Sequence, residues 1–208
     1  MAKIAMIGAG SVIFCKTLVS DILASDALKD SEICLMNRTR PKLDRMENFV
    51  QRMISDNDLP AQVWSTLDLN EALKGSKYVI VMIQVGGLEA FKHDYEIPMN
   101  YGVDQCIGDS LGPGGIFRGL RTIPVLSDIV KKMEKFCPDA ILLNYANPMA
   151  ACCYALGKVS NVPYIGLCHG VQTTLDLISS YVDVPKDQID QVCAGINHMA
   201  WFLSLKDK

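Results

Sequence analysis

Short apolar runs separated by helical segments constrain the fold of this chain more than any other feature. The run Tyr78–Ile83 is continuous and holds four β-branched residues, which is typical of a strand buried on both faces of a parallel sheet. Four further runs have the same character: Lys3–Ile7, Ile33–Met36, Ala140–Leu143 and Tyr164–Leu167. Because parallel strands that alternate with helices are joined by right-handed crossovers, the pattern predicts an α/β fold with a doubly wound, mostly parallel sheet.

Helical periodicity lies between most of these runs. Apolar residues recur at helical spacing from Phe14 to Leu23, and further helices are predicted from near Pro41, over 123–136 and over 149–159. The segment 84–116 has no clear period and carries seven glycines. Because it follows the carboxyl end of a buried strand, where ligands of open sheets bind, we expect a functional loop there.

Composition excludes several classes of partner. The chain has 208 residues and a formal net charge of -3, and no Lys/Arg cluster is dense enough to neutralise a run of phosphates, so nucleic acid is excluded. No apolar run approaches about 18 residues and the N-terminus has no signal-peptide pattern, so we expect a soluble, cytoplasmic protein with no membrane partner. The eight cysteines include no Cys-x-x-Cys spacing, which favours reduced thiols over disulfides or a structural zinc site.

A glycine turn after the first predicted strand points to a dinucleotide. Two glycines there allow a tight turn and bring the backbone N–H groups of the next helix close to a pyrophosphate. The third glycine of the usual pattern is replaced by Ile13, and an acidic residue expected at the end of the second strand is replaced by Asn37. Asn37 can hydrogen-bond a ribose hydroxyl, whereas Arg38 would favour a 2′-phosphate, so NAD and NADP both stay open. The candidate cofactor-binding residues are Gly8, Gly10, Ser11, Asn37 and Arg38.

Three short motifs fall at predicted strand ends on one side of the sheet: Asn144–Pro148, Cys168–His169 and Gly195–His198. Adjacent residues on an extended chain point to opposite faces, so Cys168 and His169 do not easily serve as nucleophile and base for each other. A metal held by Cys168 and His198 is geometrically easier, and a thiolate with an imidazole suits Mn, Fe, Co, Ni or Zn. A single cysteine beside a histidine is more often a packing residue than a catalytic or metal-binding one, so it is the three motifs together that favour a metal site at Cys168. His93 is interpreted as a solvated loop histidine.

These motifs together resemble glycoside hydrolase family 4, and most closely its α-galactosidase (melibiase) branch. The resemblance is carried by GAGS at the start of the chain, DSLGPGGIFRGLRTIP (Asp109 to Pro124), NYANPMA, GLCHGVQ and CAGINHMAW, and it covers Lys3 to Leu205. It implies a fold like that of lactate and malate dehydrogenases, and a glycosidase that depends on NAD+ and a divalent metal, usually Mn2+. In the implied mechanism NAD+ takes a hydride from C3, a base removes the C2 proton, the glycosidic oxygen is eliminated, water adds, and the ketone is reduced again.

The resemblance also assigns roles to residues. Cys168 and His198 match the metal ligands, and Asn147, with Asp109, is the candidate substrate-binding pair. His169 stands where the phospho-glycosidase branch has an acidic Asp, and an imidazole can donate a proton near neutral pH, so His169 is the candidate catalytic acid. That branch also uses an arginine for the sugar phosphate, but no arginine lies between Arg52 and Arg118 here, which favours an unphosphorylated hexoside.

Relatives implied by this resemblance are longer, and their catalytic base lies downstream of the last motif. We therefore expect residues 1–195 to form an NAD-binding Rossmann-like domain and 196–208 to begin a second, catalytic domain that is largely missing, so that the chain alone supplies only part of the active site. A homo-oligomer, dimer or tetramer, is expected for the full-length protein. The alternatives are an α-glucosidase or an α-galacturonidase or glucuronidase of the same family, a 2-hydroxy-acid dehydrogenase clamping its substrate with Arg118 and Arg121, and a truncated NAD-binding chain without turnover.

Overall fold

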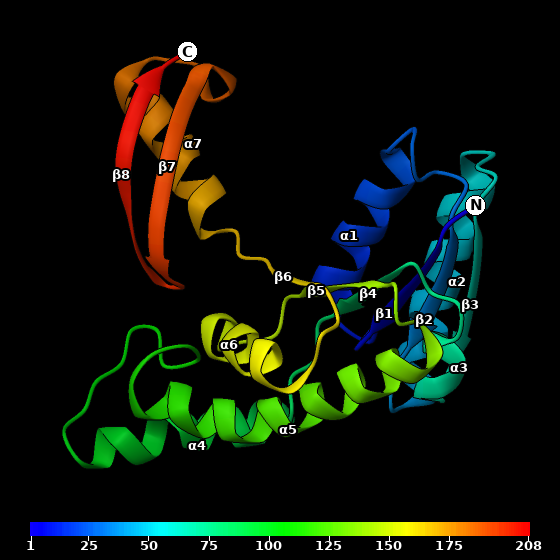
Figure 1. Cartoon of the computed structure of the whole chain (residues 1–208), viewed down its shortest axis with the longest axis horizontal. Helices are drawn as coiled ribbons and strands as arrows, with labels where there is room; N and C mark the ends of the chain where they lie inside the picture. Colours follow the sequence, from blue (N-terminus) through cyan, green and yellow to red (C-terminus); the bar gives the residue numbers. More distant parts are fainter.

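The computed structural model describes residues 1–208 and contains a six-stranded parallel sheet flanked by helices (Figure 1). The strand order is β3-β2-β1-β4-β5-β6, and every neighbouring pair is parallel. The strands are β1 (Lys3–Ile7), β2 (Glu32–Met36), β3 (Gln62–Thr66), β4 (Tyr78–Val81), β5 (Ile141–Asn144) and β6 (Tyr164–Gly166). The chain moves outward from β1 in one direction and then returns to build the other half, so the predicted doubly wound sheet is confirmed.

Two apolar layers, one on each face of the sheet, form the core. Successive residues of β1 alternate between them: Ile4 packs in the layer under α1 (Val12–Ala24) and α2 (Arg40–Asp56), whereas Ala5 packs in the other. That second layer lies under α3 (Leu69–Leu73), α5 (Gly112–Phe136) and α6 (Met149–Val159). Since both faces of the central strands are covered, these strands read as continuous apolar runs in the sequence.

The segment 84–116 differs from its prediction as an irregular loop. It contains α4 (Gly87–Asn100) and the start of α5, so only the stretch between these two helices is non-helical. Tertiary contacts explain the difference: Asp94 of α4 is buried and pairs with Arg121 of α5. Gln105 adds a bridge, because its amide nitrogen donates to the Asp94 carbonyl at 3.2 Å and its amide oxygen accepts from the Gly114 N–H at 2.9 Å. Helix α4 is hidden from periodicity because its buried residues are Asp94 and Pro98, which do not form an apolar stripe.

The chain leaves the sheet after β6 and forms a separate unit at the other side of the molecule (Figure 1). Helix α7 (Gly170–Val182) leads through a short 3-10 turn (Lys186–Gln188) into an antiparallel hairpin of β7 (Ile189–Ile196) and β8 (Met199–Asp207). The two strands pair from Ile189 with Asp207 to Ile196 with Met199, with one register shift between Val192 and Cys193, and β7 runs through residues 195 and 196 without a break. The division of the chain after Gly195 stays a prediction.

None of the helices combines the length and the apolar character that crossing a bilayer requires. All eight cysteines are free thiols. Four of them are buried in the core: Cys15, Cys34, Cys137 and Cys152. Burial raises the pKa of the Cys15 thiol to about 12, so in the core it behaves as a small apolar side chain.

Candidate functional site

The glycine turn between β1 and α1 is held against the ends of two neighbouring strands. Gly8 and Ala9 donate their backbone N–H groups to the Met36 carbonyl of β2 at 2.9 and 3.0 Å. Gly8 has a φ of +92°, and a Cβ there would meet the Met82 carbonyl oxygen at 2.8 Å. Only glycine combines this left-handed conformation with so close a backbone approach, so the structure explains Gly8 locally.

Gly10 and Asn37 are brought together at the same turn. A Cβ on Gly10 would overlap the Asn37 amide, which itself donates to the Thr39 hydroxyl at 3.3 Å. Arg38 next to it is exposed. The side chain of Asn37 therefore lies beside the glycine turn, where an extra methyl group would displace it.

The first turn of α1 is open. Ser11 is the N-cap residue, but its side chain makes no capping hydrogen bond, and the first turn contains no acidic residue. Free N–H groups at a helix N-terminus suit an anion, and no carboxylate competes with it here. Ile13 occupies the place of the third glycine. Its side chain is 78% exposed, so it points away from the sheet and does not prevent α1 from packing against it.

Asp109 and Asn147, separated by 38 positions, meet in space. The Asn147 amide nitrogen donates to the Asp109 carboxylate at 2.9 Å, and Arg118 Nε donates to the Asn147 carbonyl at 3.2 Å. The Arg118 guanidinium also lies 3.9 Å from the Asp109 carboxylate and 5.6 Å from the centre of the Phe91 ring. Burial lowers the pKa of Arg118, against the attraction of Asp109, so this cluster is largely withdrawn from water.

The two terminal nitrogens of Arg121 are engaged elsewhere, and its Nε is buried without a hydrogen-bond partner. Its two terminal nitrogens bind the two Asp94 oxygens at 2.8 and 2.5 Å, and these hydrogen bonds raise the pKa of Arg121. Asp94 is only 1% exposed. This bidentate pair with a buried carboxylate links α4 to α5. Arg121 is therefore unsuited to the role of substrate clamp that the sequence suggests for it.

Cys168 and His169 follow β6 and have different neighbours. The Cys168 Sγ accepts from the Gly170 N–H at 3.4 Å and lies 3.3 Å from the Asn197 amide nitrogen. The exposed His169 ring lies 5.7 Å, centre to centre, from the Phe14 ring in the first turn of α1. His169 is therefore placed beside the helix that follows the glycine turn, and Cys168 faces the hairpin.

His198, in the turn between β7 and β8, lies next to the same amide group as Cys168. Its Nε2 lies 3.1 Å from the Asn197 amide nitrogen, which is also the neighbour of the Cys168 sulfur. No group of three or more His, Cys, Asp or Glu side chains in the structure could hold a metal ion, so this pair stands without an acidic ligand beside it. One polar atom here has no partner: the buried Asn197 Oδ1.

Comparison with known proteins identifies the chain's family. The family model described as family 4 glycosyl hydrolase matches residues 3–184. The chain belongs to glycoside hydrolase family 4. It is 42% identical over 205 residues to an alpha-galactosidase of Rhizobium meliloti (strain 1021), a match covering 98% of this chain and 42% of the relative. It is 43% identical over 207 residues to an alpha-galactosidase of Bacillus subtilis (strain 168), covering 99% and 48%.

This family 4 chain spans less than half the length of those two relatives. Among solved structures it is similar to the 6-phospho-beta glucosidase of Thermotoga maritima with manganese, NAD+ and glucose-6-phosphate: TM-score 0.88, 23% identity, 100% of this chain and 49% of that one. Lactate dehydrogenase from Eimeria maxima follows with a TM-score of 0.72 and 15% identity, over 99% of this chain and 56% of that one. These likenesses confirm the predicted dehydrogenase-like fold.

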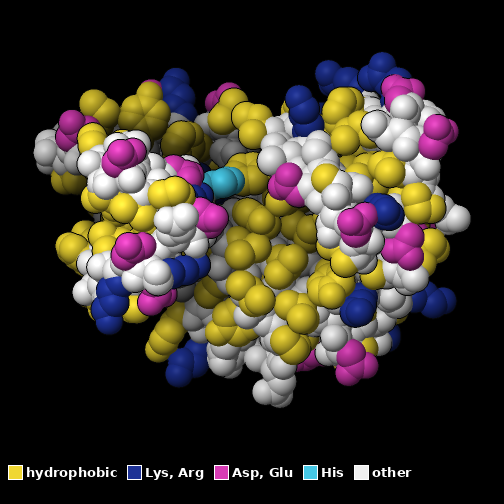
Figure 2. Space-filling model, turned by 90° about the horizontal axis from the view of Figure 1, so that it is seen from above, with side chains coloured by type: hydrophobic (Ala, Val, Ile, Leu, Met, Phe, Trp, Pro, Cys, Tyr) yellow, Lys and Arg dark blue, Asp and Glu magenta, His cyan; other side chains and the backbone are white.

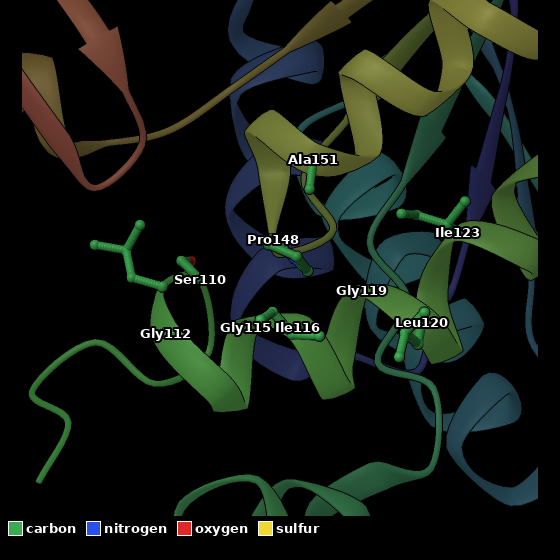
Figure 3. A pocket seen from close by; sticks show the side chains of 10 residues that line it. Ser110, Gly112, Gly115, Ile116, Gly119, Leu120, Ile123, Pro148 and Ala151 are labelled. Carbon is green, nitrogen blue, oxygen red and sulfur yellow. The ribbon is translucent and has the colours of Figure 1, made fainter. Parts of the chain in front are cut away.

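The family 4 chain also carries an apolar cavity of about 380 Å³ beside Pro148, between the start of α5 and α6 (Figure 3). Its walls are almost entirely glycine and aliphatic side chains, with Ser110 as the one hydroxyl. A hexose needs several hydrogen-bond partners when buried, so this cavity does not suit a sugar. Seen from above, hydrophobic side chains also gather in a hollow between the hairpin side and the sheet side, with a histidine at its rim (Figure 2).

The contacts of three residues could not be found from local sequence patterns. In the sequence, Asn197 is one residue of a short motif, Asp94 lies in a segment predicted to be a loop, and Arg118 is a candidate dehydrogenase clamp. His93 is exposed as expected, but it lies on α4 and not in a loop. The pairing of Asp94 with Arg121 spans 27 positions, so no local spacing could have indicated it.

Proposed function

We propose that this chain is the NAD- and metal-binding part of an α-galactosidase that hydrolyses unphosphorylated α-galactosides by oxidation, elimination and addition. One observation carries the proposal. Cys168 and His198 converge on one amide nitrogen, while His169, the residue after Cys168, contacts Phe14 in the first turn of the glycine-turn helix. If Cys168 and His198 bind a metal, this arrangement would bring that metal close to the place where a dinucleotide would bind.

The glycine turn fits a dinucleotide. The first turn of α1 would receive the pyrophosphate, because its N–H groups are free and no acidic residue stands in it. Asn37, beside Gly10, would donate to a ribose hydroxyl by giving up its bond to Thr39. The exposed Arg38 could bind the 2′-phosphate of NADP. We nevertheless propose NAD+, because the amide of Asn37 suits a free ribose hydroxyl.

Cys168 and His198 fit a divalent cation such as Mn2+. A thiolate and an imidazole are the donor set of first-row transition metals, and the Gly170 N–H and the Asn197 amide both point at the sulfur. When bound, NAD+ would take a hydride from C3 of the sugar and give it back, while the cation would draw electron density from the C2 and C3 oxygens. The protein's own residues then bind the sugar and move protons.

Asn147 and Asp109 would orient the galactoside. Asn147 keeps a second N–H and its side-chain oxygen after bonding Asp109, and Arg118 holds its backbone carbonyl in place. His169 would give its proton to the departing glycosidic oxygen, since it is exposed and an imidazole exchanges protons near neutral pH. The Phe14 ring lies on one side of the imidazole and would favour this orientation of it.

The absence of arginine from residues 53–117 supports an unphosphorylated substrate, because bidentate recognition of a sugar phosphate favours arginine. Identity to two alpha-galactosidases supports galactosides over the glucosides or uronides of neighbouring branches. The preference among hexosides is tested directly by comparing p-nitrophenyl α-galactoside with the α-glucoside and the α-galacturonide.

The proposal is tested by measuring p-nitrophenol release with NAD+, Mn2+ and a thiol reductant, alongside NADH binding by fluorescence. We expect NADH to bind and any hydrolysis to require both NAD+ and Mn2+. Cys168→Ser should abolish the metal-dependent activity and leave NADH affinity nearly unchanged, whereas equal loss of both would make Cys168 a core residue. Hydrolysis that persists after removal of both NAD+ and Mn2+ would refute the mechanism.

A further inference from the structure

Asn197 occupies the point at which the two metal donors meet. Its amide nitrogen lies 3.3 Å from Cys168 Sγ and 3.1 Å from His198 Nε2. Its oxygen, by contrast, is buried without any hydrogen-bond partner. A side-chain amide that leaves a buried oxygen unpaired pays a desolvation cost of about 1–3 kcal/mol, so its placement calls for a reason.

The Asn197 amide has two N–H groups, and both metal-ligand atoms, Cys168 Sγ and His198 Nε2, can accept a hydrogen bond from it. A thiolate sulfur has several lone pairs, so it can accept the Asn197 N–H and still bind a cation. A neutral imidazole nitrogen has one lone pair, so His198 Nε2 must exchange the Asn197 N–H for the cation. The bond to the sulfur would therefore remain when a cation is bound, whereas the bond to the ring would be present only in the cation-free state.

The same residue ties two separate parts of the chain. His198 is exposed and lies in the β7–β8 turn, whereas Cys168 follows the last strand of the main sheet. Among the hydrogen bonds of residues 189–207, only the one from Asn197 reaches the segment that joins β6 to α7. Without it, no hydrogen bond would hold the hairpin turn against Cys168.

We propose that Asn197 is the positioning residue of the metal centre. Its amide orients the Cys168 sulfur, and in the cation-free state it also holds His198 beside that sulfur, so that both side chains are positioned to receive one cation. This inference rests on the proposed function, because it requires Cys168 and His198 to be the ligands. Partners of this kind, which orient the ligands without binding the metal, typically change metal affinity about 10–100-fold when removed.

The test compares Asn197→Ala and Asn197→Asp with the unmodified chain. Mn2+ affinity is read from the electron paramagnetic resonance signal of free Mn2+, and the thiolate bond from the charge-transfer absorption of Co2+ bound in its place. Asn197→Ala should weaken Mn2+ binding about 10–100-fold and change the Co2+ band. Asn197→Asp should weaken it at least as much, because a carboxylate cannot donate to the sulfur and repels the thiolate.

The controls separate this role from the others. Asn161→Ala changes an exposed asparagine whose side chain makes no hydrogen bond, and it should bind Mn2+ like the unmodified chain. NADH fluorescence should show that each variant is folded. Unchanged Mn2+ binding in Asn197→Ala would overturn the proposal. Tighter binding in Asn197→Asp would also overturn it, because the side-chain oxygen at position 197 would then be a metal ligand. If Cys168→Ser binds Mn2+ like the unmodified chain, the metal centre itself fails, and the role of Asn197 falls with it.

Discussion

Replacing Asp94 by asparagine should destabilise the fold without touching the cofactor turn. Asp94 is 1% exposed and binds both terminal nitrogens of Arg121, whose side chain is 29% exposed. The amide would keep one acceptor but place an NH2 group against the guanidinium nitrogen 2.5 Å away. Breaking a fully buried pair costs about 3–5 kcal/mol, and partial hydration of Arg121 lowers this to about 2–3 kcal/mol.

The assay is urea unfolding followed by circular dichroism, with thermal melting as a second measure. A loss of this size lowers the melting temperature by about 4–12 °C in a chain of this length. NADH affinity should stay unchanged because α4 and α5 lie away from the glycine turn. Asp104→Asn, at an exposed aspartate in the following loop, is the matched control. If Asp94→Asn loses no more stability than Asp104→Asn, the pair with Arg121 does not hold α4 to α5.

Further predictions concern the turn and the cysteines. Gly8→Ala should lower the free energy of unfolding by about 1–2 kcal/mol through backbone strain, and it should weaken NADH binding through a clash with the Met82 carbonyl. Gly75→Ala, also at positive φ but with nothing within 4 Å, should cause the strain alone and leave NADH binding intact. NADH titration of both variants checks this. Mn2+ should slow the alkylation of Cys168 by iodoacetamide, measured by mass spectrometry. Equal rates with and without Mn2+ would argue that Cys168 is not a metal ligand. Burial raises the pKa of the Cys15 thiol from 9.0 to about 12, so its neutral form contributes stability that is complete below about pH 9 and is lost as the pH rises toward 12. The alkaline fall in melting temperature should therefore be smaller in Cys15→Ala, and an identical fall would show that this thiol does not contribute.

Much of the sheet could be predicted because its strands are buried on both faces. The apolar run at Tyr78 marked β4, and a similar signal marked β1, β2, β5 and β6. The edge strand β3 was missed because its side chains are mostly part-exposed and its sequence, QVWST, mixes polar and apolar residues. Helix α4 was missed because burial of a charged residue, Asp94, and not an apolar stripe, fixes it to α5.

The candidate site was predictable where its residues sit in short motifs at strand ends. The motifs of Cys168 and His198 could be recognised separately, and their approach in space follows from the hairpin that carries His198 back toward β6. The role of Asn197 could not be read from the sequence, because an asparagine beside a histidine gives no sign of where its amide points. Only the distances to both donors distinguish it.

The central claim is that the metal donors lie beside the dinucleotide turn. Proton relaxation of bound NAD+, measured by NMR with Mn2+ titrated into the chain, tests it most directly, because a paramagnetic ion speeds the relaxation of nearby protons. The account predicts strong enhancement for the nicotinamide protons, abolished in Cys168→Ser while NAD+ stays bound. Absence of enhancement in the unmodified chain, or enhancement that survives in Cys168→Ser, would contradict it.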